Sequence, residues 1–535
     1  MSAKTITEQP SFLNFIRQEK IVRRWLVIAL AAICGQWVIF KLFYPFASFF
    51  FTDSFGYLYA AGYNLDAHIW PVGYSKFLRV FNTFLHSDTA LVCFQYVFLQ
   101  AAGLYFFFTL LYLFRPPKLL SVILFVSLVV NPLSLYLANS ISSDALFTGL
   151  SLLWMAQLMQ MVARPARRLI FIQAVLLTLL FTLRYTAIYY PLVSGIALLF
   201  STYTRKEKGW AIALPLLLIG GFIFHTAHVN KEITGIRKFA PFGGWQLANN
   251  ALYMFGHDRP APESVPARFA ELDGRVRRYF DTARRERTLL DLTYPGDFYL
   301  WSLQSPLADY QGLQGSKDNA AAYYKKWVTL SALYGDYGSW LIAQHPMAYA
   351  EYYCWPNLQR YAFPPLEFMD RYNSGRDTVD RLAVAWFHYK NQQVRAFSPA
   401  IQASILAPYP ALCLLINLCW LGLLFLFLTT GKVRRADPAF SRQVMIIGST
   451  WVLHFAFSIL AAPVVLRYQA FPMILGGAGC LLLAAQLLKS EQAETNENKI
   501  GEIKTTLHET QKNNHRGLRL LPGVFIRLHR YRQTP

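Results

Sequence analysis

The chain has 535 residues, of which 54% are hydrophobic, 16% aromatic and only 15% charged. Its six cysteines lie mostly in apolar segments, which excludes a disulfide framework or a cysteine-based metal site. The net charge of +21 does not indicate a nucleic-acid partner, because the excess lies in short loops, in residues 275–287 and in the tail. Positive-inside bias and attraction to anionic lipid headgroups account for that pattern.

Ten apolar runs without aspartate, glutamate, lysine or arginine follow one another along the chain, and about 20 apolar residues cross a hydrocarbon core. A tight turn is expected at Arg184, because one helix through both flanking runs would be far longer than a bilayer is thick. The sequence therefore predicts an all-α polytopic membrane protein with about ten transmembrane helices. The runs are Trp25 to Phe40, Thr89 to Phe114, Leu119 to Ser143, Ala145 to Ala163, Leu169 to Leu183, Tyr185 to Thr204, Gly209 to Phe224, Ala403 to Gly431, Val444 to Leu466 and Tyr468 to Leu488.

Lysine and arginine cluster before the first run and then in every second gap, as expected of loops that stay in the cytoplasm. We therefore expect a multi-pass protein of the inner (plasma) membrane with both termini in the cytoplasm. The polar, basic N-terminus predicts no cleavable signal. The basic residues are Arg17, Lys20, Arg23 and Arg24; Arg115 and Lys118; Arg164, Arg167 and Arg168; Arg205, Lys206 and Lys208; and Lys432, Arg434 and Arg435.

Four parts of the chain follow from this topology. Residues 1–229 are expected to form an N-terminal transmembrane core whose first outer loop lies at the membrane interface. Residues 230–402 are expected to form an extracytoplasmic, mainly helical domain, and residues 403–489 the C-terminal transmembrane helices. Residues 490–535 read as a disordered cytoplasmic basic tail with a membrane-surface segment.

Two acids lie where spans meet the outward face. Asp53 follows the first span, and Asp144 opens the fourth in the string SISSDALF. Taken singly, Asp53 reads as an interface residue, because ionisable groups cost less at the membrane boundary than at its centre. Asp144, with Ser142 and Ser143, reads as a helix N-cap. Together on one face, they are candidate catalytic residues.

Two isolated arginines share that face. Arg184 stands between two apolar runs, and Arg467 stands in PVVLRYQAFP. Each either snorkels to lipid headgroups or binds an anionic substrate. Four tyrosines near these charges either belong to an interfacial aromatic belt or contact substrate. They are Tyr57, Tyr74, Tyr185 and Tyr468.

The order of these motifs along the chain resembles that in the GT-C fold glycosyltransferases of the family 39-like group, which includes protein O-mannosyltransferases and the lipid A aminoarabinose transferase. The resemblance covers roughly residues 20–230 and 440–488. Many relatives have an Asp-Glu pair in the first loop, where this chain has Asp53 and Ser54. The matching strings are TDSFGYLYAA, PVGYSKFL, SISSDALF, LRYTAIYYP and LRYQAFP.

The resemblance implies an inverting transfer of a sugar from a polyprenyl-phosphate donor to a hydroxyl of a glycan, lipid or protein. A carboxylate must accept the hydroxyl proton, and Asp53 is the candidate base. Arg467, and then Arg184, are candidates to bind the departing phosphate. Asp144 orients the acceptor, shares the base role, or holds a divalent cation with Asp53. The sequence names neither a metal nor another cofactor.

Three other function classes stay open. A lipid-linked-glycan transporter would need ionisable groups near the membrane midplane, where His454 alone stands well inside a span. A polysaccharide polymerase or ligase would use arginines of an outward loop, such as Arg275 to Arg287, and would not need Asp53. A membrane scaffold, which only presents the outward domain to a partner, would need neither acid.

Overall fold

The computed structural model describes residues 11–285, 296–312, 320–429 and 437–489. In these ranges the chain forms helices and loops, with isolated bridges at Ser48–Ser140 and Thr378–Gln393 in place of strands. The predicted all-α class is confirmed. The predicted basic tail, residues 490–535, lies outside the described residues.

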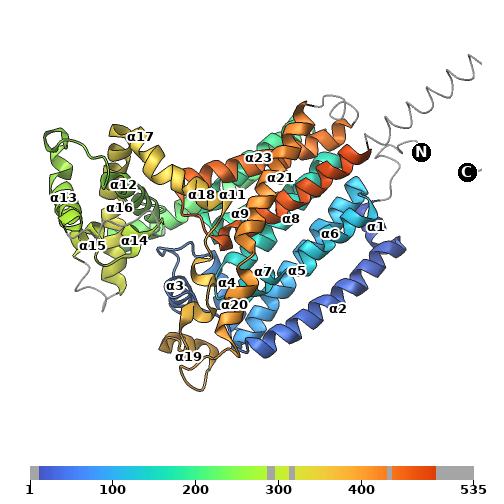
Figure 1. Cartoon of the computed structure of the whole chain (residues 1–535), viewed down its shortest axis with the longest axis horizontal. Coiled ribbons are helices and arrows are strands. Elements are labelled where there is room, and N and C mark those ends of the chain that lie inside the picture. Colours follow the sequence, from blue (N-terminus) through green and yellow to red (C-terminus); the bar gives the residue numbers. More distant parts are fainter. Residues whose placement is uncertain (1–10, 286–295, 313–319, 430–436, 490–535) are drawn as a thin grey trace, which may run out of the picture.

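The helices fall into three sets along the chain (Figure 1). The first set is α1 Phe12–Gln18, α2 Lys20–Phe43, α3 Asp53–Gly62, α4 Gly73–Asn82, α5 Asp88–Phe114, α6 Lys118–Val129, α7 Pro132–Asn139, α8 Asp144–Ala163, α9 Arg167–Leu183, η2 Tyr185–Tyr189, α10 Tyr190–Phe200 and α11 Arg205–Thr234. The second is α12 Phe242–Phe255, η3 Pro262–Ser264, η4 Ala267–Phe269, α13 Ala270–Arg285, α14 Phe298–Trp301, α15 Pro306–Gln311, α16 Ala320–Gln344, α17 Pro346–Tyr349, η6 Ala350–Cys354, α18 Trp355–Ala362, η7 Glu367–Met369, η8 Tyr372–Gly375 and α19 Arg381–Phe387. The third is α20 Pro399–Leu406, α21 Tyr409–Thr429, α23 Pro438–Ala461 and a last helix, Leu466–Lys489.

Eight helical segments of the described chain, counting α6 with α7 and α20 with α21 as one segment each, are long and apolar enough to cross a membrane, and they coincide with eight of the ten predicted runs. The other two runs form shorter helices, α9 with 17 residues and the apolar segment Tyr185–Phe200. The helix breaks between them at Arg184, which has extended backbone (φ −150°, ψ 126°), as the expected turn requires. The protein is therefore a polytopic membrane protein.

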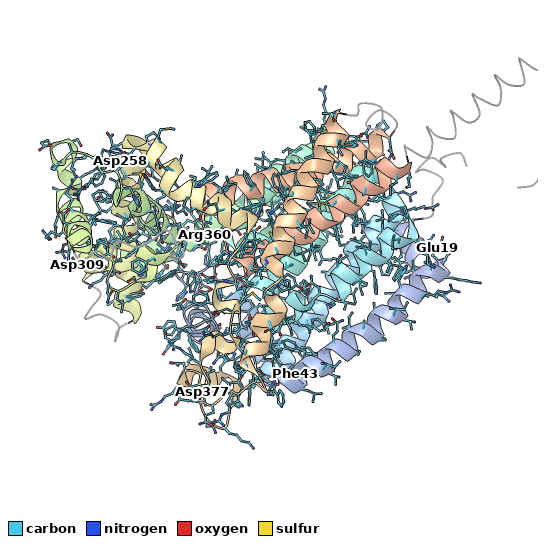
Figure 2. All side chains as sticks on the ribbon, viewed as in Figure 1. Glu19, Phe43, Asp258, Asp309, Arg360 and Asp377 are labelled. Atoms are coloured by element: carbon cyan, nitrogen blue, oxygen red, sulfur yellow. The ribbon has the colours of Figure 1, made fainter. Side chains whose placement is uncertain are left out.

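The described basic gaps before α6, α9 and α11 lie at helix ends that contacts bring together. Arg167 pairs with Glu207 at 2.9 Å, which joins the gap before α9 to the start of α11. Lys489 donates to the carbonyl of Phe114 at 3.3 Å, which brings the last helix to the end of α5. In Figure 2 Glu19, at the start of α2, lies far from the helical domain that contains Asp258 and Asp309. That this end lies in the cytoplasm stays a prediction.

α11 links the bundle to the outer domain because it runs for 30 residues, well beyond a membrane span. A capping box fixes its start, in which Thr204 accepts from the backbone of Glu207 and the Glu207 side chain accepts from Thr204. Gly235 ends the helix with φ 83°, a left-handed conformation that glycine adopts without strain. The Asn230 side chain, near that end, accepts a hydrogen bond from Tyr324 of α16 at 2.6 Å.

The outward segment 230–402 is not one unit around one core. Residues 245–353 bury their own aromatic core, in which Trp245 stacks on Trp327 at 4.0 Å. The later part packs instead on the first outer loop, where Val379, Ala383 and Phe387 share a core with Leu58. The outer loop thus contacts both parts, since Ala67 and Ile69 belong to the first core.

α12 and α16 cross with almost no space between their backbones. A Cβ on Gly244 would lie 1.8 Å from the carbonyl oxygen of Ser331, and a Cβ on Gly338 would lie 2.5 Å from the carbonyl carbon of Leu247. Only glycine permits this approach. The crossing fixes α12, which carries several residues of the site described below.

Gly244→Ala is therefore expected to lower the free energy of unfolding by about 2–3 kcal/mol, since the added methyl group must push the two helices apart. Gly243→Ala is the matched control, because nothing lies within 4 Å of a Cβ at that neighbouring position. Thermal unfolding of the two purified variants compares them. Equal midpoints would contradict the role given to the crossing.

Candidate functional site

The first outer loop is attached to the turn before α8. The backbone of Ser48 donates to Asn139 at 2.8 Å and accepts from Ile141 at 2.9 Å. The buried hydroxyl of Ser54 donates to the carbonyl of Ile141 at 2.7 Å. These bonds bring the start of α3 beside the start of α8. They also explain why this chain has Ser54 where many members of the resembled family have the second acid of an Asp-Glu pair. The Ser54 side chain is fully buried, and its hydroxyl donates to a backbone carbonyl.

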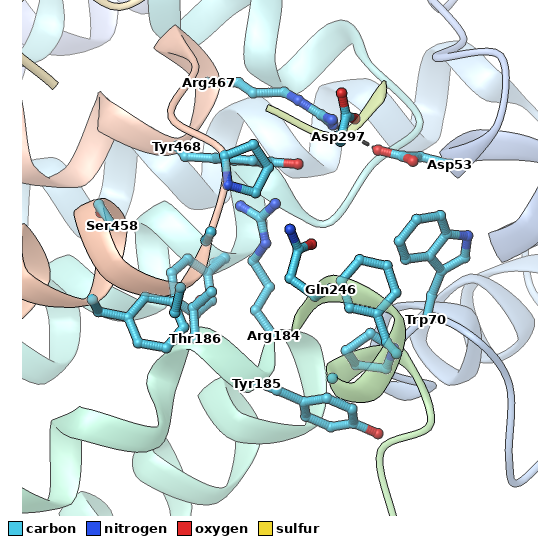
Figure 3. Close-up of a pocket in the computed structure, with 18 of the residues that line it drawn as sticks. Asp53, Trp70, Arg184, Tyr185, Thr186, Gln246, Asp297, Ser458, Arg467 and Tyr468 are labelled. Atoms are coloured by element: carbon cyan, nitrogen blue, oxygen red, sulfur yellow. Dashed lines mark hydrogen bonds and ion pairs between the residues drawn. The ribbon is translucent and has the colours of Figure 1, made fainter. Parts of the chain in front are cut away.

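Asp53, Asp144, Arg184 and Arg467 form one ion-pair cluster, although they come from four separate parts of the chain. Arg467 Nη1 donates to Asp53 Oδ2 at 2.7 Å and lies 3.6 Å from Asp144 Oδ2. Arg184 Nη1 donates to Asp144 Oδ1 at 2.7 Å. Figure 3 shows the Asp53–Arg467 pair beside Arg184. The predicted convergence of these residues is thus observed, and both arginines point inward instead of snorkelling to headgroups.

Asp144 is 1% exposed and lies behind the arginines. It is the first residue of α8, and its carboxylate caps no backbone amide, so the N-cap interpretation is wrong. Besides the arginines, the hydroxyl of Ser142 donates to it at 2.8 Å. Because Asp144 does not line the cavity, the predictions that it orients an acceptor or shares the base role are not supported by its position.

The predicted tyrosines separate into two groups. Tyr57, Tyr185 and Tyr468 line the cavity, and both guanidinium groups lie against the Tyr468 ring, 4.3 Å from its centroid for Arg184 and 4.7 Å for Arg467. Burial raises the pKa of Tyr57 to about 12, so its phenol stays protonated. The prediction that Tyr74 contacts substrate is wrong, because Tyr74 is fully buried outside the cavity and donates to Gln95 at 2.8 Å. It faces inward because Tyr74, Ser75 and Leu78 form the buried side of α4.

A cavity of about 800 Å³ lies in front of the cluster. Asp53, Arg184 and Arg467 form part of its wall near the ends of the spans. The apolar part of the wall includes Phe457 of α23 and Ile188. Ile188 is 62% exposed, so this part of the wall reaches the outer surface of the bundle. The cavity therefore joins a charged region to an exposed apolar region.

Two further acids border the cluster, and sequence reasoning missed both. Asp297 lines the cavity in the loop before α14, near Arg467 in Figure 3, and burial raises its pKa. Glu367 Oε2 lies 3.5 Å from Arg467 Nε. Asp297 carries no distinctive local pattern. Glu367 stands alone between apolar residues in PPLEFMD, a signal that could have found it.

Glu367 is held in an unusual backbone conformation. Its φ is 51°, in the left-handed region that residues other than glycine rarely adopt. The neighbouring Pro365 carbonyl accepts from the backbone of Leu466 at 2.9 Å, which attaches this segment to the start of the last helix. Burial raises the pKa of Glu367 to about 7, while nearby Arg467 opposes that rise.

This pKa predicts a pH dependence of stability. A carboxyl whose pKa rises from 4.5 to about 7 on folding binds more protons in the folded state between those pH values, so stability falls as pH rises through that window. The loss reaches up to about 3 kcal/mol above pH 7. Glu367→Gln is expected to remove this part of the slope. Thermal unfolding of both proteins from pH 5 to pH 8 measures it, and parallel curves would contradict the assignment.

The acids do not suit a divalent cation. Within the described residues, no group of three or more histidine, cysteine, aspartate or glutamate side chains could hold a metal ion. Both oxygens of Asp144 already contact Arg184, Ser142 or Arg467, and one oxygen of Asp53 accepts from Arg467. The predicted alternative of a cation between Asp53 and Asp144 therefore does not fit this charge arrangement.

Two arginines of α13 are engaged elsewhere. Arg275 pairs with Asp309 at 3.2 Å, and Arg277 pairs with Asp273. No α13 residue is part of the cavity wall over the described part of that helix. The described portion of the stretch 275–287 thus gives no support to the polymerase or ligase alternative.

Comparison with known proteins adds one match. Residues 77–257 match a protein family described as "Predicted membrane protein (DUF2142)". The matched segment includes Asp144 and Arg184 and ends before Asp297 and Arg467. No curated protein and no solved structure matches the chain. The family description agrees with a membrane protein and names no activity.

Proposed function

We propose that this protein is an inverting glycosyltransferase that moves a sugar from a polyprenyl-phosphate donor to an acceptor hydroxyl at the extracytoplasmic face of the membrane. One observation carries the proposal: Asp53 and two arginines, Arg184 and Arg467, share the wall of one cavity of about 800 Å³. A phosphate needs cations, and a hydroxyl nucleophile needs a base. The order of motifs that resembles GT-C glycosyltransferases supports the same reaction.

The shape of the cavity suits an amphipathic donor. Its apolar wall, with Phe457, Phe471 and exposed Ile188, can receive a lipid chain from the bilayer. Its charged wall can receive the phosphate. The hydrogen bonds of Arg184 and Arg467 to acids use one Nη1 atom each, and a guanidinium has five N–H donors. The other donors can bind phosphate oxygens.

In the proposed reaction the acceptor oxygen attacks the anomeric carbon while the bond from that carbon to the phosphate oxygen breaks. The sugar configuration inverts, the electron pair leaves with the polyprenyl phosphate, and the hydroxyl proton passes to Asp53. Asp53 is paired with Arg467 at 2.7 Å before the donor binds. A phosphate that takes over Arg467 would release Asp53 to act as the base.

Asp144 has a positioning role in this proposal. It contacts both arginines and is excluded from the cavity, so it orients the guanidinium groups and balances their charge. Glu367 gives Arg467 a third acid neighbour. Loss of Asp144 would therefore act through donor binding.

The test is transfer by the purified full-length chain from a panel of polyprenyl-phosphate sugars, with the matching nucleotide sugars as a comparison. Asp53→Asn is the inactive variant, and Asp370→Asn is the matched control, since Asp370 is exposed and outside the cavity. Transfer from at least one polyprenyl-phosphate sugar, lost only in Asp53→Asn, supports the proposal. Transfer that does not need Asp53 would favour a polymerase or ligase, and no transfer from any donor would overturn the proposal.

A further inference from the structure

The half of the cavity nearest the outer domain has an aromatic wall. Trp70 of the first outer loop lies 5.1 Å from Trp301 and 5.6 Å from Phe242, measured between ring centroids. All three residues line the cavity and are only half-buried. Gly56 gives Trp70 its space, because a Cβ there would lie 2.7 Å from the indole nitrogen. Aromatic faces of this kind pack against the C–H face of a ligand ring.

A chain of buried amides supports the polar side of the same region. The backbone of Leu300 donates to Asn249 Oδ1 at 3.0 Å, which fixes the Asn249 nitrogen as a donor to Gly296 at 2.8 Å and to Asn250 Oδ1 at 3.1 Å. The Gln246 nitrogen donates to the same Asn250 oxygen at 2.7 Å. The backbone partners of this network thus fix which atom of each side-chain amide is the donor and which is the acceptor.

The amide chain has two consequences for the cavity. The Gln246 oxygen is left as an acceptor with no hydrogen-bond partner among the described residues, although Gln246 is 7% exposed and lines the cavity. Buried acceptors rarely stay unpaired. The Asn249 bonds also hold the backbone on both sides of Asp297, and Phe298 adds a bond to Tyr253 at 3.1 Å. The carboxyl of Asp297 is therefore presented on a fixed loop.

We infer that this half of the cavity is the acceptor subsite and that the acceptor is a saccharide, with Trp70 and Trp301 packing on a sugar ring while Gln246 and Asp297 accept its hydroxyls. The inference rests on the proposed function and names its acceptor class. Asp297 is a specificity residue here, distinct from Asp53 as the base. Burial raises the pKa of Asp297.

The chemistry of this surface separates a saccharide from the other acceptor classes. A serine or threonine side chain offers one hydroxyl, which the attack itself uses, so Gln246 and Asp297 would have only peptide N–H groups as donors, and Trp70 and Trp301 would have no sugar ring to pack on. A phospholipid headgroup carries a negative phosphate that Asp297 would repel. A saccharide supplies several hydroxyl donors and an apolar ring face together.

Binding can be measured without transfer, by isothermal titration calorimetry on the full-length chain in nanodiscs. Maltoside detergents are avoided because they carry a sugar. The probes are disaccharides of glucose, galactose, mannose and N-acetylglucosamine, a serine- and threonine-containing peptide, and phosphatidylethanolamine vesicles. We expect at least one disaccharide to bind, about tenfold more weakly to Gln246→Met and to Asp297→Asn, and equally to Asp370→Asn.

If Gln246→Met does not fold, Trp301→Phe in the aromatic wall takes its place in this comparison, and thermal unfolding checks each protein. The absence of disaccharide binding, binding of the peptide or vesicles instead, or undiminished binding to folded Gln246→Met and Asp297→Asn would overturn the inference. Disaccharide binding without any transfer would contradict the proposed function alone. Transfer to a peptide would contradict the acceptor class alone.

Discussion

Asp53→Asn is expected to reduce the rate of sugar transfer by about 10²–10⁴-fold, the usual contribution of a positioned general base. Asparagine has the same shape and keeps an oxygen toward Arg467, but its amide cannot take a proton. Initial rates with a polyprenyl-phosphate sugar, compared at equal folded fraction, measure the loss. A rate equal to wild type would remove Asp53 from the base role.

The same variant separates the base role from a role in donor binding. Asp53 accepts a hydrogen bond from Arg467 at 2.7 Å in the absence of a phosphate. Because asparagine holds a guanidinium less strongly than a carboxylate does, the donor should meet less competition for Arg467. The expected pattern is a low kcat with a donor KM that does not rise. A large rise in KM at unchanged kcat would instead indicate that Asp53 binds the donor.

Arg467→Met is expected to lower the free energy of unfolding by about 3–5 kcal/mol and to abolish transfer. The side chain is 6% exposed and lies between Asp53, Asp144 and Glu367, so its removal takes the cation from Asp53 and Glu367, while Asp144 keeps Arg184. Arg268→Met is the matched control, because that arginine is exposed and pairs with exposed Asp336. The control should change stability by less than about 0.5 kcal/mol.

A double variant tests whether charge is the cause. Asp53→Asn added to Arg467→Met removes one of the unpaired acids, so it should restore part of the lost stability and none of the transfer. Lower pH should also stabilise Arg467→Met relative to wild type, because the buried acids then bind protons. Thermal unfolding of both variants at pH 5 and pH 8 measures this, and a double variant less stable than the single one would exclude the charge explanation.

The spans and the core of the cluster could be predicted because their signals are local or follow from topology. An apolar run reports a membrane helix wherever it occurs. Once the spans alternate, Asp53, Asp144, Arg184 and Arg467 must share one end of the bundle, and the structure brings them within hydrogen-bonding distance.

Asp297 and Gln246 could not be identified from the sequence because their roles depend on tertiary packing. Asp297 resembles many other acids of the outward segment until Asn249 binds the backbone on both sides of it. Tyr74 is a candidate substrate contact in the sequence because it lies near Asp53, but the direction of α4 turns its side chain toward Gln95. The division of residues 230–402 between two cores also depends on contacts with the first loop.

The Asp53–Arg467 pair joins residues 414 positions apart. Asp53 therefore enters the membrane interface early in synthesis, while its cation is added only when the last helix, Leu466–Lys489, has been inserted. The long connection makes closure of the pair a late event in folding. Until that helix docks, the hydrogen bond from Leu466 to Pro365 is also absent. The site is therefore complete only when the whole membrane region has been assembled.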